Sequence, residues 1–393
     1  MNILYTLTAY PPSIGGAQLH HHALAQRIAT RHTIRVLTHW DSNRTDWLLG
    51  TTLTAPAQHY QYELDGISVH RIGIPLHRKV RLVPYVFLYY IAMNLSVSAI
   101  AANLVSRILE DARGSDLIHN VRIGREPISY ASFHAAKRRD IPFVFTPLHH
   151  PRWIGWRYRV YTDLYKSADL IIALTRSEQK HLMALGVEPH KIFITGIGPI
   201  LSSEAYPDEF RRKNSIDGPI VLFLGQHYTY KGYRHLLEAT KNVWRMEPET
   251  HFVFIGPAVG DSERIFSRIP DSRIHRLGTV NLQEKSNALA ASTILCVPST
   301  QESFGGVYTE AWSYGKPVIG CRVPAVSEII YDGEDGLLVD QDSAEIADRI
   351  VELLGSDKLR STMGKRGKKK VETQYSWEAI ANRTEQAYQA VLR

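Results

Sequence analysis

Short apolar runs alternate along the chain with longer segments in which apolar positions recur at helical spacing. This alternation is typical of parallel sheets that are covered by helices on both faces. The predicted strands are residues 3–7, 34–38, 117–119, 143–146, 170–174, 221–224, 252–255, 294–297, 318–319 and 337–339. The pattern therefore predicts an α/β chain built from doubly wound, Rossmann-like sheets.

The apolar runs fall into two series, separated by a polar stretch from about residue 202 to 218. The stretch contains Pro207 and the charged run 209–213, which favours a linker. With 393 residues, the chain is long enough for two hydrophobic cores. We expect an N-terminal domain over residues 1–200 and a C-terminal domain over residues 201–375. Ligands of doubly wound sheets bind beyond the carboxyl ends of the strands, so the two domains would face a shared central cleft.

Two carboxylates, Glu302 and Glu310, lie eight residues apart around a Ser-Phe-Gly-Gly turn that follows the predicted strand 294–297. A strand end, a tight turn and a helix start form a common phosphate site, because the first amides of the helix are free and the dipole is positive there. We expect the amides of Gly305, Gly306 and Val307 to hold a phosphate. Glu302 and Glu310 would then flank a bound diphosphate.

The segment from Glu302 to Glu310 resembles the Glu-x7-Glu signature of the retaining glycosyltransferases of family 4, which have the two-domain GT-B fold. Other segments resemble this family in order along the whole chain. They are Tyr10-Pro11-Pro12 with Gly15-Gly16, Leu224-Gly225 through Lys231-Gly232, Pro317 to Gly320, Asp332-Gly333, Gly336 to Val339, and Tyr375-Ser376-Trp377. The last of these resembles the closing helix of the family, so residues 376–393 are expected to pack back on the N-terminal domain.

The resemblance assigns a role to each residue around the motif. Glu310 would accept hydrogen bonds from the ribose hydroxyls of the nucleotide, and Glu302 would bind hydroxyls of the donor sugar. Ser303 and Phe304 would shape the turn. Lys231 would neutralise the diphosphate, and these cations and amides could replace a metal ion, so we expect neither a metal nor a cofactor.

One position departs from the family pattern, because Gln226 stands where an arginine is usual. A neutral amide can donate a hydrogen bond to phosphate but supplies no charge. His227 and Arg276 are candidate substitutes for the missing cation. Because of this departure, the alternative stays open that the protein binds nucleotide-sugars weakly and has little catalytic activity.

In the N-terminal domain, the candidate residues for binding the donor or the acceptor are glycines and histidines. Gly15 and Gly16 would let the backbone approach the donor or the acceptor, although a simple turn is the alternative, and Gln18 would lie close by. His149 follows the strand 143–146 and resembles the family histidine beside the donor sugar, with His150 as the alternative register. His119 is a weaker candidate for the acceptor side. His20, His21 and His22 are expected to be scattered helix-surface residues, because adjacent helical positions point in different directions.

Charge is distributed unevenly. Residues 1–200 contain 22 Lys and Arg against 13 Asp and Glu, whereas residues 201–393 contain 24 against 26. A basic half suggests an anionic neighbour such as a membrane surface or a lipid phosphate. Nucleic acid is not expected as a partner, because no helix-turn-helix, zinc-finger or RNA-recognition signature accompanies the charge.

The longest apolar stretch, residues 82–105, is interrupted by Pro84, Asn94 and Asn103, which argues against a transmembrane span. We favour a long core helix here. Peripheral membrane contact is the alternative, because His77 to Arg81 combines cations with the aromatic rings that follow, as do residues 152–159.

The first residues of the chain show no pattern of a secretory signal, and their apolar run predicts a strand. The two cysteines, Cys296 and Cys321, lie in strand-like runs and fit a reducing cytoplasm, with the inner membrane face as an alternative location.

Together these features predict a retaining, metal-independent glycosyltransferase that uses UDP-glucose or UDP-N-acetylglucosamine more readily than GDP-mannose. Its acceptor would be a glycan or a lipid-linked molecule in cell-envelope or exopolysaccharide synthesis. The residues expected to act in catalysis are Glu302, Lys231 and His149, without a protein nucleophile. The alternatives are a nucleotide-sugar epimerase, hydrolase or phosphorylase on a similar scaffold, and a non-catalytic binding protein.

Overall fold

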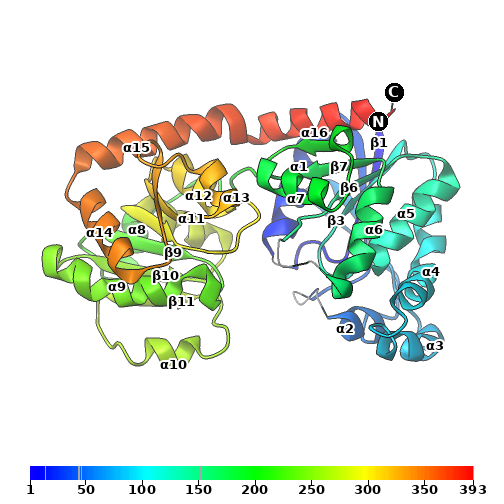
Figure 1. Ribbon diagram of the computed structural model, residues 1–393, viewed down its shortest axis with the longest axis horizontal. Helices are drawn as coiled ribbons and strands as arrows, with labels where there is room; N and C mark the ends of the chain where they lie inside the picture. Colours follow the sequence, from blue (N-terminus) through cyan, green and yellow to red (C-terminus); the bar gives the residue numbers. More distant parts are fainter. Residues whose placement is uncertain (14, 43–44, 46, 151–152, 154, 393) are drawn as a thin grey trace. The chain divides into compact units, whose positions relative to one another are not determined.

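The computed structural model describes residues 1–13, 15–42, 45, 47–150, 153 and 155–392. The chain forms two compact units (Figure 1): Met1–Gly196 with Trp377–Arg393, and Ile197–Ser376. We call them the N-terminal and C-terminal domains. The chain thus passes between the domains at residue 196 and again at residue 376, and the last helix, α16 (Trp377–Leu392), belongs to the N-terminal domain.

The N-terminal domain has an eight-stranded sheet in the order β3-β4-β2-β1-β5-β6-β7-β8. Its strands are β1 (Asn2–Leu7), β2 (Thr33–Thr38), β3 (Tyr60–Leu64), β4 (Ile67–Arg71), β5 (Leu117–Val121), β6 (Phe143–Thr146), β7 (Leu170–Ala173) and β8 (Ile192–Ile194). All neighbouring pairs are parallel except β3 and β4. The prediction of purely parallel sheets is therefore wrong at this edge.

The antiparallel pair is a hairpin closed by Asp65 and Gly66, which both have positive φ, at 50° and 76°. An Asp-Gly pair at these angles matches the right-handed twist of the two strands that it joins. The side chains of β3 are exposed or half-buried, as befits an edge strand that covers little core.

Helices cover both faces of this sheet. They are α1 (Gly16–Ala29), α2 (Leu48–Leu53), α3 (Leu76–Phe87), α4 (Met93–Asp111), α5 (Pro127–Arg139), α6 (Arg159–Ser167), α7 (Arg176–Ala184) and α16, with the short 3-10 turns η1 (Trp156–Tyr158) and η2 (Pro189–Lys191). Alternate residues of β1 point to opposite faces. Leu4 joins a core with α4 and α5, whereas Tyr5 joins a second core with α1 and α16. Figure 1 shows α16 beside α1.

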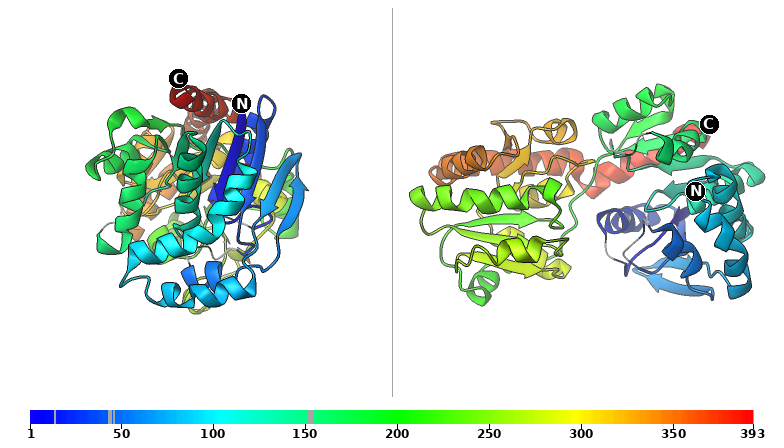
Figure 2. Two further views of the ribbon diagram at one scale, coloured as in Figure 1. Left: turned by 90° about the vertical axis from the view of Figure 1, so that its right-hand side faces the viewer. Right: turned by 60° about the horizontal axis from the view of Figure 1, so that its bottom comes forward.

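The apolar stretch 82–105 is not a single long helix, because α3 ends at Phe87 and α4 begins at Met93. Pro84 lies inside α3, within its last turn. Figures 1 and 2 show α3 at the outer edge of the N-terminal domain. Among the described residues, no helix is both long enough and apolar enough to cross a membrane.

The C-terminal domain has a six-stranded, fully parallel sheet in the order β11-β10-β9-β12-β13-β14. Its strands are β9 (Ile220–Leu224), β10 (His251–Ile255), β11 (Ile274–Gly278), β12 (Ile294–Val297), β13 (Val318–Cys321) and β14 (Gly336–Val339). Every residue of β9 and β12 is buried, as expected for central strands covered on both faces. Cys296 and Cys321 are buried and form no disulfide.

The helices of this domain are α8 (Pro207–Lys213), α9 (Tyr233–Met246), α10 (Ser262–Phe266), α11 (Leu282–Ala291), α12 (Gly306–Ser313), α13 (Pro324–Ile329), α14 (Ser343–Leu354) and α15 (Asp357–Lys370), with the turns η3 (Thr229–Lys231) and η4 (Val371–Tyr375). The predicted linker at 202–218 is wrong. This segment contains α8, and the amides of Ser202 and Tyr206 donate to Ser286 and Asn287 of α11. It belongs to the body of the C-terminal domain.

Candidate functional site

The strand order of the C-terminal domain reverses between β9 and β12, which lie side by side in the middle of the sheet. Ligands of open α/β sheets bind at such a switch point, beyond the carboxyl ends of the strands. The loops that leave β9 and β12 here are residues 225–232 and 298–305. These loops carry both motifs that the sequence singled out.

The two loops are held against one another by backbone contacts. The amide of Thr300 donates to the carbonyl of Tyr230 over 2.9 Å. The side-chain amide of Gln341 donates to Tyr230 and Pro298, so it ties one loop to the other. Gly232 has φ of 84°, and a Cβ there would lie 2.4 Å from the carbonyl oxygen of Pro298. A glycine is therefore required at this crossing, and the site has a fixed frame.

Lys231 and Glu302 form an ion pair across these loops, with Nζ 2.6 Å from Oε1. The lysine side chain is 21% exposed and the glutamate side chain 11%. Sequence reasoning assigned the two residues to different parts of a donor but did not predict that they pair. Because an ammonium has three N–H donors, Lys231 can hold Glu302 and still donate to a further anion.

The turn before α12 presents free backbone amides. Gly305 precedes the helix with φ of 89°, and a Cβ there would lie 2.4 Å from the ring of Tyr308. Among the described residues, the amides of Gly305, Gly306 and Val307 make no backbone hydrogen bond, whereas that of Tyr308 donates to Gly305. The Tyr308 hydroxyl anchors the helix to β12 by donating to Val297. An anion can approach these free amides as at other helix N-termini.

The two residues before Gly305, Ser303 and Phe304, differ in burial. The Phe304 side chain is buried and contacts the ring of Tyr375 edge to face at 5.3 Å. Its role is therefore to hold the turn on the domain core rather than to offer its ring to a ligand. Ser303 lies in the same turn and is half-buried.

Glu310 lies on α12 and is 6% exposed. Its Oε1 is 2.7 Å from Nζ of Lys285, which lies on α11. Sequence reasoning missed Lys285, and no motif marks it, because its importance comes from the packing of α11 beside α12. The site thus contains a second lysine–glutamate pair, so both motif carboxylates have a cationic partner.

The candidate substitutes for the missing arginine do not supply a free charge. His227 is buried against the rings of Tyr233 and Phe266, and burial lowers its pKa to about 4. Arg276 forms an ion pair with Glu263. The prediction that His227 supplies the missing charge is therefore wrong, whereas that for Arg276 stays a prediction. Gln226 itself is exposed at the carboxyl end of β9.

An Asp-x-Asp pair, Asp340 and Asp342, directly follows β14, and the expectation of a metal-free site did not take it into account. Asp340 pairs with Arg322, and Asp342 accepts the amides of Ala344 and Glu345 as the N-cap of α14. These contacts give both carboxylates a structural role.

In the N-terminal domain the strand order reverses between β1 and β5. Gly15 and Gly16 lie after β1, where α1 begins. A Cβ on Gly15 would lie 2.2 Å from Oε1 of Gln18, whereas Gly16 has open space around its Cα. Gln18 is buried, and its side chain packs against Gly15 in this turn.

The three consecutive histidines are buried, so the expectation of surface residues is wrong. His21 Nδ1 contacts the carbonyl of Ala17, and His22 lies between Tyr10 and Asp65. His20 contacts the ring of Trp377 on α16. Each of the three side chains thus has partners of its own in the domain core. Among the described residues, no three His, Cys, Asp or Glu side chains lie close enough to hold a metal.

His119 is also structural. Its Nδ1 is 2.7 Å from the Tyr388 hydroxyl of α16, and its Nε2 is 2.7 Å from Thr146 Oγ1. Both ring nitrogens are thus used inside the core, and burial lowers the pKa of the imidazole. The prediction of a role on the acceptor side is wrong.

His149 follows β6 at the carboxyl edge of the sheet and is buried. Its Nδ1 is 3.2 Å from the Tyr165 hydroxyl, and its amide donates to Glu178 over 2.6 Å. Burial and the nearby charge of Arg122 lower its pKa to about 4, so the ring is neutral near pH 7. His150 lies next to it, with its ring 5.1 Å from that of Trp153.

Sequence reasoning missed a buried charged cluster around His149. Arg122 follows β5 and stacks between Trp153 and Tyr161, at 3.8 and 3.6 Å from their ring centres. Glu126 is fully buried and lies beside the hydroxyl of Tyr161. Burial raises the pKa of Glu126 to about 7. The only sequence signal was the position of both residues after a predicted strand.

Comparison with known proteins adds independent findings. A model of the "glycosyl transferase 4-like domain" matches residues 15–198, and one of "glycosyl transferases group 1" matches residues 218–356. The phosphatidyl-myo-inositol mannosyltransferase of Mycobacterium leprae (strain TN) is 34% identical over 179 residues, which cover 44% of this chain and 47% of that protein. The sulfoquinovosyl transferase SQD2 of Arabidopsis thaliana is 26% identical over 320 residues, which cover 75% and 60%. The chain spans about half the length of the curated relatives that it matches.

Solved structures resemble the whole chain. The crystal structure of HepE from Anabaena in complex with UDP and glucose superposes with a TM-score of 0.76 at 20% identity, covering 99% of this chain and 100% of that one. The fold is GT-B, as predicted, with two Rossmann-like domains.

Proposed function

Because the chain belongs to the group 1, family 4-like glycosyltransferases, we propose that it transfers a sugar from a nucleotide-diphosphate sugar to an acceptor hydroxyl. One observation carries this proposal. Two carboxylates, each paired with a lysine, bracket the free amides at the start of α12. This arrangement offers hydrogen-bond acceptors for hydroxyls and donors for phosphate within one short segment.

The charges of the site suit the bond that breaks in such a reaction. When the bond between the sugar and the diphosphate opens, negative charge grows on the departing phosphate oxygen. Lys231 and the amides of Gly305, Gly306 and Val307 would donate to the phosphate and stabilise the transition state more than the ground state. Glu302 would turn toward the sugar hydroxyls, and Glu310 toward the ribose, as their family counterparts are expected to do.

We propose that the configuration of the sugar is retained by attack on the face from which the diphosphate leaves. The departing phosphate oxygen would take the proton of the acceptor hydroxyl. No side chain then needs to act as a nucleophile or as a strong base. His149, with its lowered pKa, would act as a neutral hydrogen-bonding group beside the donor sugar.

UDP-sugars are the donors to test first, because the structurally similar HepE was crystallised with UDP and glucose. UDP-glucose, UDP-N-acetylglucosamine and GDP-mannose would be compared by thermal shift on the full chain, with and without EDTA. A ligand that binds the native state alone raises the apparent stability. We expect a UDP-sugar to give the largest rise and EDTA to leave it unchanged.

The activity test uses a radiolabelled donor with glycan and lipid extracts as acceptors. Labelled product should form with the native chain and should be lost with Glu302→Ala. Lys241→Ala is the matched control, because Lys241 is an exposed lysine on α9 of the same domain. Conversion of the donor to an epimer without any acceptor would instead establish the epimerase alternative.

We also propose that the N-terminal domain contacts an anionic membrane surface, where a lipid-linked acceptor would be found. Leu76, Val80, Val83 and Phe87 recur at helical spacing on α3 and are 38% to 72% exposed. Ile91, beyond the end of α3, is 79% exposed. We call these five residues the apolar stripe. An exposed stripe of this kind marks an interaction surface.

The charge around the apolar stripe supports a membrane as its partner. Residues 66–109 contain five arginines and lysines and no aspartate or glutamate. Trp156, which is 56% exposed, and Tyr90 lie near one another with Arg157 and Arg159 at their rings. Arg152, which the sequence grouped with them, lies outside the described residues. Cations with amphipathic rings suit the headgroup region.

Vesicle flotation tests this surface. The native chain should bind vesicles with anionic phosphatidylglycerol more tightly than neutral phosphatidylcholine vesicles. Phe87→Ser with Ile91→Ser should weaken binding by about tenfold or more, because each lost apolar contact is worth about 1.5–3 kcal/mol when fully buried. Met246→Ser, at a residue 69% exposed in the C-terminal domain, is the control. Equal binding by the double variant would refute the membrane contact.

A further inference from the structure

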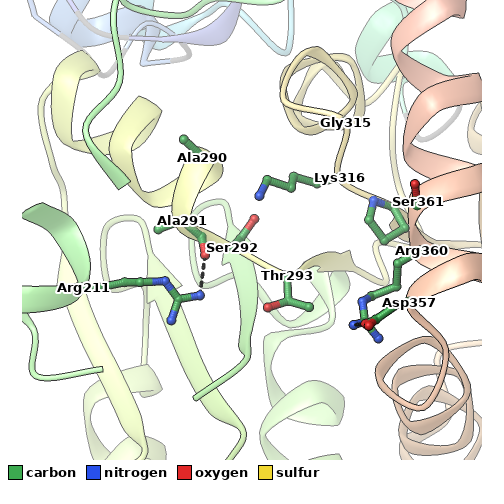
Figure 3. A pocket seen from close by; sticks show the side chains of 11 residues that line it. Arg211, Ala290, Ala291, Ser292, Thr293, Gly315, Lys316, Asp357, Arg360 and Ser361 are labelled. Atoms are coloured by element: carbon green, nitrogen blue, oxygen red, sulfur yellow. Dashed lines mark hydrogen bonds and ion pairs between the residues drawn. The ribbon is translucent and has the colours of Figure 1, made fainter. Parts of the chain in front are cut away.

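A cavity lies in the C-terminal domain, at the edge of the sheet opposite to the candidate site. Thr293 immediately precedes β12 and Lys316 lies just before β13, so the cavity opens at the amino ends of these strands. Its volume is about 410 Å³. Figure 3 shows side chains from several elements that line it, namely α8, the end of α11, the segment after α12 and the start of α15. The sequence motifs did not predict it.

Cations dominate the charge of this cavity. Arg211, Lys316 and Arg360 line it, against a single carboxylate, Asp357. The Asp357 side chain is 93% exposed and pairs with Arg360. Among the described residues, neither Arg211 nor Lys316 forms an ion pair with a carboxylate. Two positive charges in the lining are therefore left without an acidic partner.

The two arginines are fixed in place by backbone carbonyls. Arg211 donates over 2.8 Å to Gly218 and to Ala291, and Figure 3 shows the second of these bonds. Arg360 donates to Leu353 and Leu354 at the end of α14. A guanidinium held in this way keeps further N–H donors, and it loses little conformational entropy when an anion binds.

The Lys316 ammonium is unfavourable in the empty cavity, because its charge has no negative partner there among the described residues. It is half-buried, and Figure 3 shows its ammonium group directed into the cavity. Burial, together with the charge of Arg211, lowers the pKa of Lys316. A bound anion would relieve both effects. Close by, Thr293 Oγ1 accepts the amide of Ile220, so its hydroxyl hydrogen remains able to donate.

We propose that this cavity binds the phosphate group of a small anionic metabolite. Its volume is in the range of small-molecule sites and is too small for a folded partner. The two uncompensated charges match a phosphate monoester, which carries close to two negative charges near neutral pH. Arg211, Lys316 and Thr293 would donate to the phosphate oxygens. The proposal concerns residues away from the donor site and does not depend on the proposed transfer reaction.

The test is calorimetric titration of the full chain with inorganic phosphate, pyrophosphate and a hexose phosphate at constant ionic strength. Lys316→Gln should weaken phosphate binding by about tenfold or more, since it removes a charge-assisted hydrogen bond. Lys241→Gln should leave it unchanged. Ser361→Asp, on the exposed rim of the cavity, should also weaken binding by repulsion, and it keeps the test valid if Lys316→Gln does not fold.

The donor site is the competing location for the same anions, and Lys231→Gln separates the two. Binding that persists in Lys231→Gln and is lost in Lys316→Gln supports the cavity. Binding that is lost in Lys231→Gln and unchanged in Lys316→Gln places the anion at the donor site and overturns the proposal. Absence of binding by all three anions to the native chain overturns it as well. Failure of sugar transfer alone would leave this result unaffected.

Discussion

The carboxyl ends of the two sheets hold acidic side chains in opposite electrostatic settings. In the C-terminal domain, Glu302 and Glu310 each lie within 2.7 Å of a lysine ammonium. In the N-terminal domain, Glu126 and Glu178 are buried and form no ion pair among the described residues, and Glu178 accepts hydrogen bonds from the amides of His149 and Leu174. Burial raises the pKa of both N-terminal carboxyls to about 7.

The two edges therefore differ in how their carboxylates are compensated. In the C-terminal domain each carboxylate is neutralised by a lysine, which suits the diphosphate binding that we propose there. The N-terminal carboxyls change their protonation close to neutral pH, so the polarity of that edge depends on pH. Four substitutions, two among the lysine–glutamate pairs and two elsewhere, test this difference between the domains.

Removing the cation of the first pair should have the largest effect. Lys231→Ala deletes the proposed donor to the phosphate and leaves Glu302 without its partner. We expect kcat/KM for sugar transfer to fall by about 10²–10³, as when one preorganised donor is lost from other enzymes. Steady-state kinetics with the best UDP-sugar measures this. A loss of less than about threefold, equal to that of Lys241→Ala, would show that the pair is structural.

Removing the buried carboxyl of Glu126 should change how the free energy of unfolding of the chain depends on pH. Between about pH 4.5 and 7, folded Glu126 keeps a proton that the unfolded chain releases, so the free energy of unfolding falls as pH rises through this window. Its contribution to this fall is about 3 kcal/mol. Glu126→Gln cannot ionise, and its stability difference between pH 5 and pH 8 should shrink by about that amount.

Urea unfolding of both chains at pH 5, 6, 7 and 8 measures this prediction. The comparison across pH cancels any constant packing cost of the amide. Asp140→Asn, at an exposed carboxyl of the same domain, is the control. Parallel curves for the native chain and Glu126→Gln would mean that the carboxyl titrates normally.

Neutralising the second motif carboxylate should affect donor binding more than turnover. Glu310→Gln keeps the shape of the side chain but weakens its pair with Lys285 and the hydrogen bonds that we propose it makes to ribose. We expect the KM for the donor to rise about tenfold, the cost of one charge-assisted bond, with a smaller change in kcat. A loss confined to kcat would place Glu310 at the reacting bond instead.

Restoring the arginine of the family pattern should have the smallest effect. Gln226→Arg adds a cation at the carboxyl end of β9, where neither His227 nor Arg276 supplies a free one. Because the position is exposed, its charge is screened, and we expect the Kd for the donor to fall by a few-fold, or about 1 kcal/mol or less. Titration calorimetry in low salt measures it. Weaker binding in Gln226→Arg would show that the present glutamine donates a specific hydrogen bond.

Local pattern was sufficient for most of the fold. Each predicted apolar run became a strand, because buried parallel strands need continuous apolar residues. The hairpin of β3 and β4 was missed although Asp65-Gly66 signals such a turn. The strand β8 was missed because its apolar run is only three residues long, and β11 because polar residues interrupt its apolar ones.

The candidate site was predictable where it depends on one loop and unpredictable where it depends on packing between segments. The turn at Gly305 follows from neighbouring residues. Lys285 meets Glu310 only because α11 packs beside α12, and the burial of His20 depends on Trp377 from the far end of the chain. The same holds for Glu126, whose pKa is raised by burial, and burial depends on tertiary packing.

The return of α16 to the N-terminal domain also bears on synthesis. The Tyr388 hydroxyl lies 2.9 Å from that of Tyr5 and 2.7 Å from His119, so the final helix fills the core around the first strand. A ribosome makes Tyr388 only after all of residues 197–376 have been synthesised. The N-terminal domain therefore cannot complete its core before the residues of the C-terminal domain have been made, and the groove beside β1 stays unfilled until then.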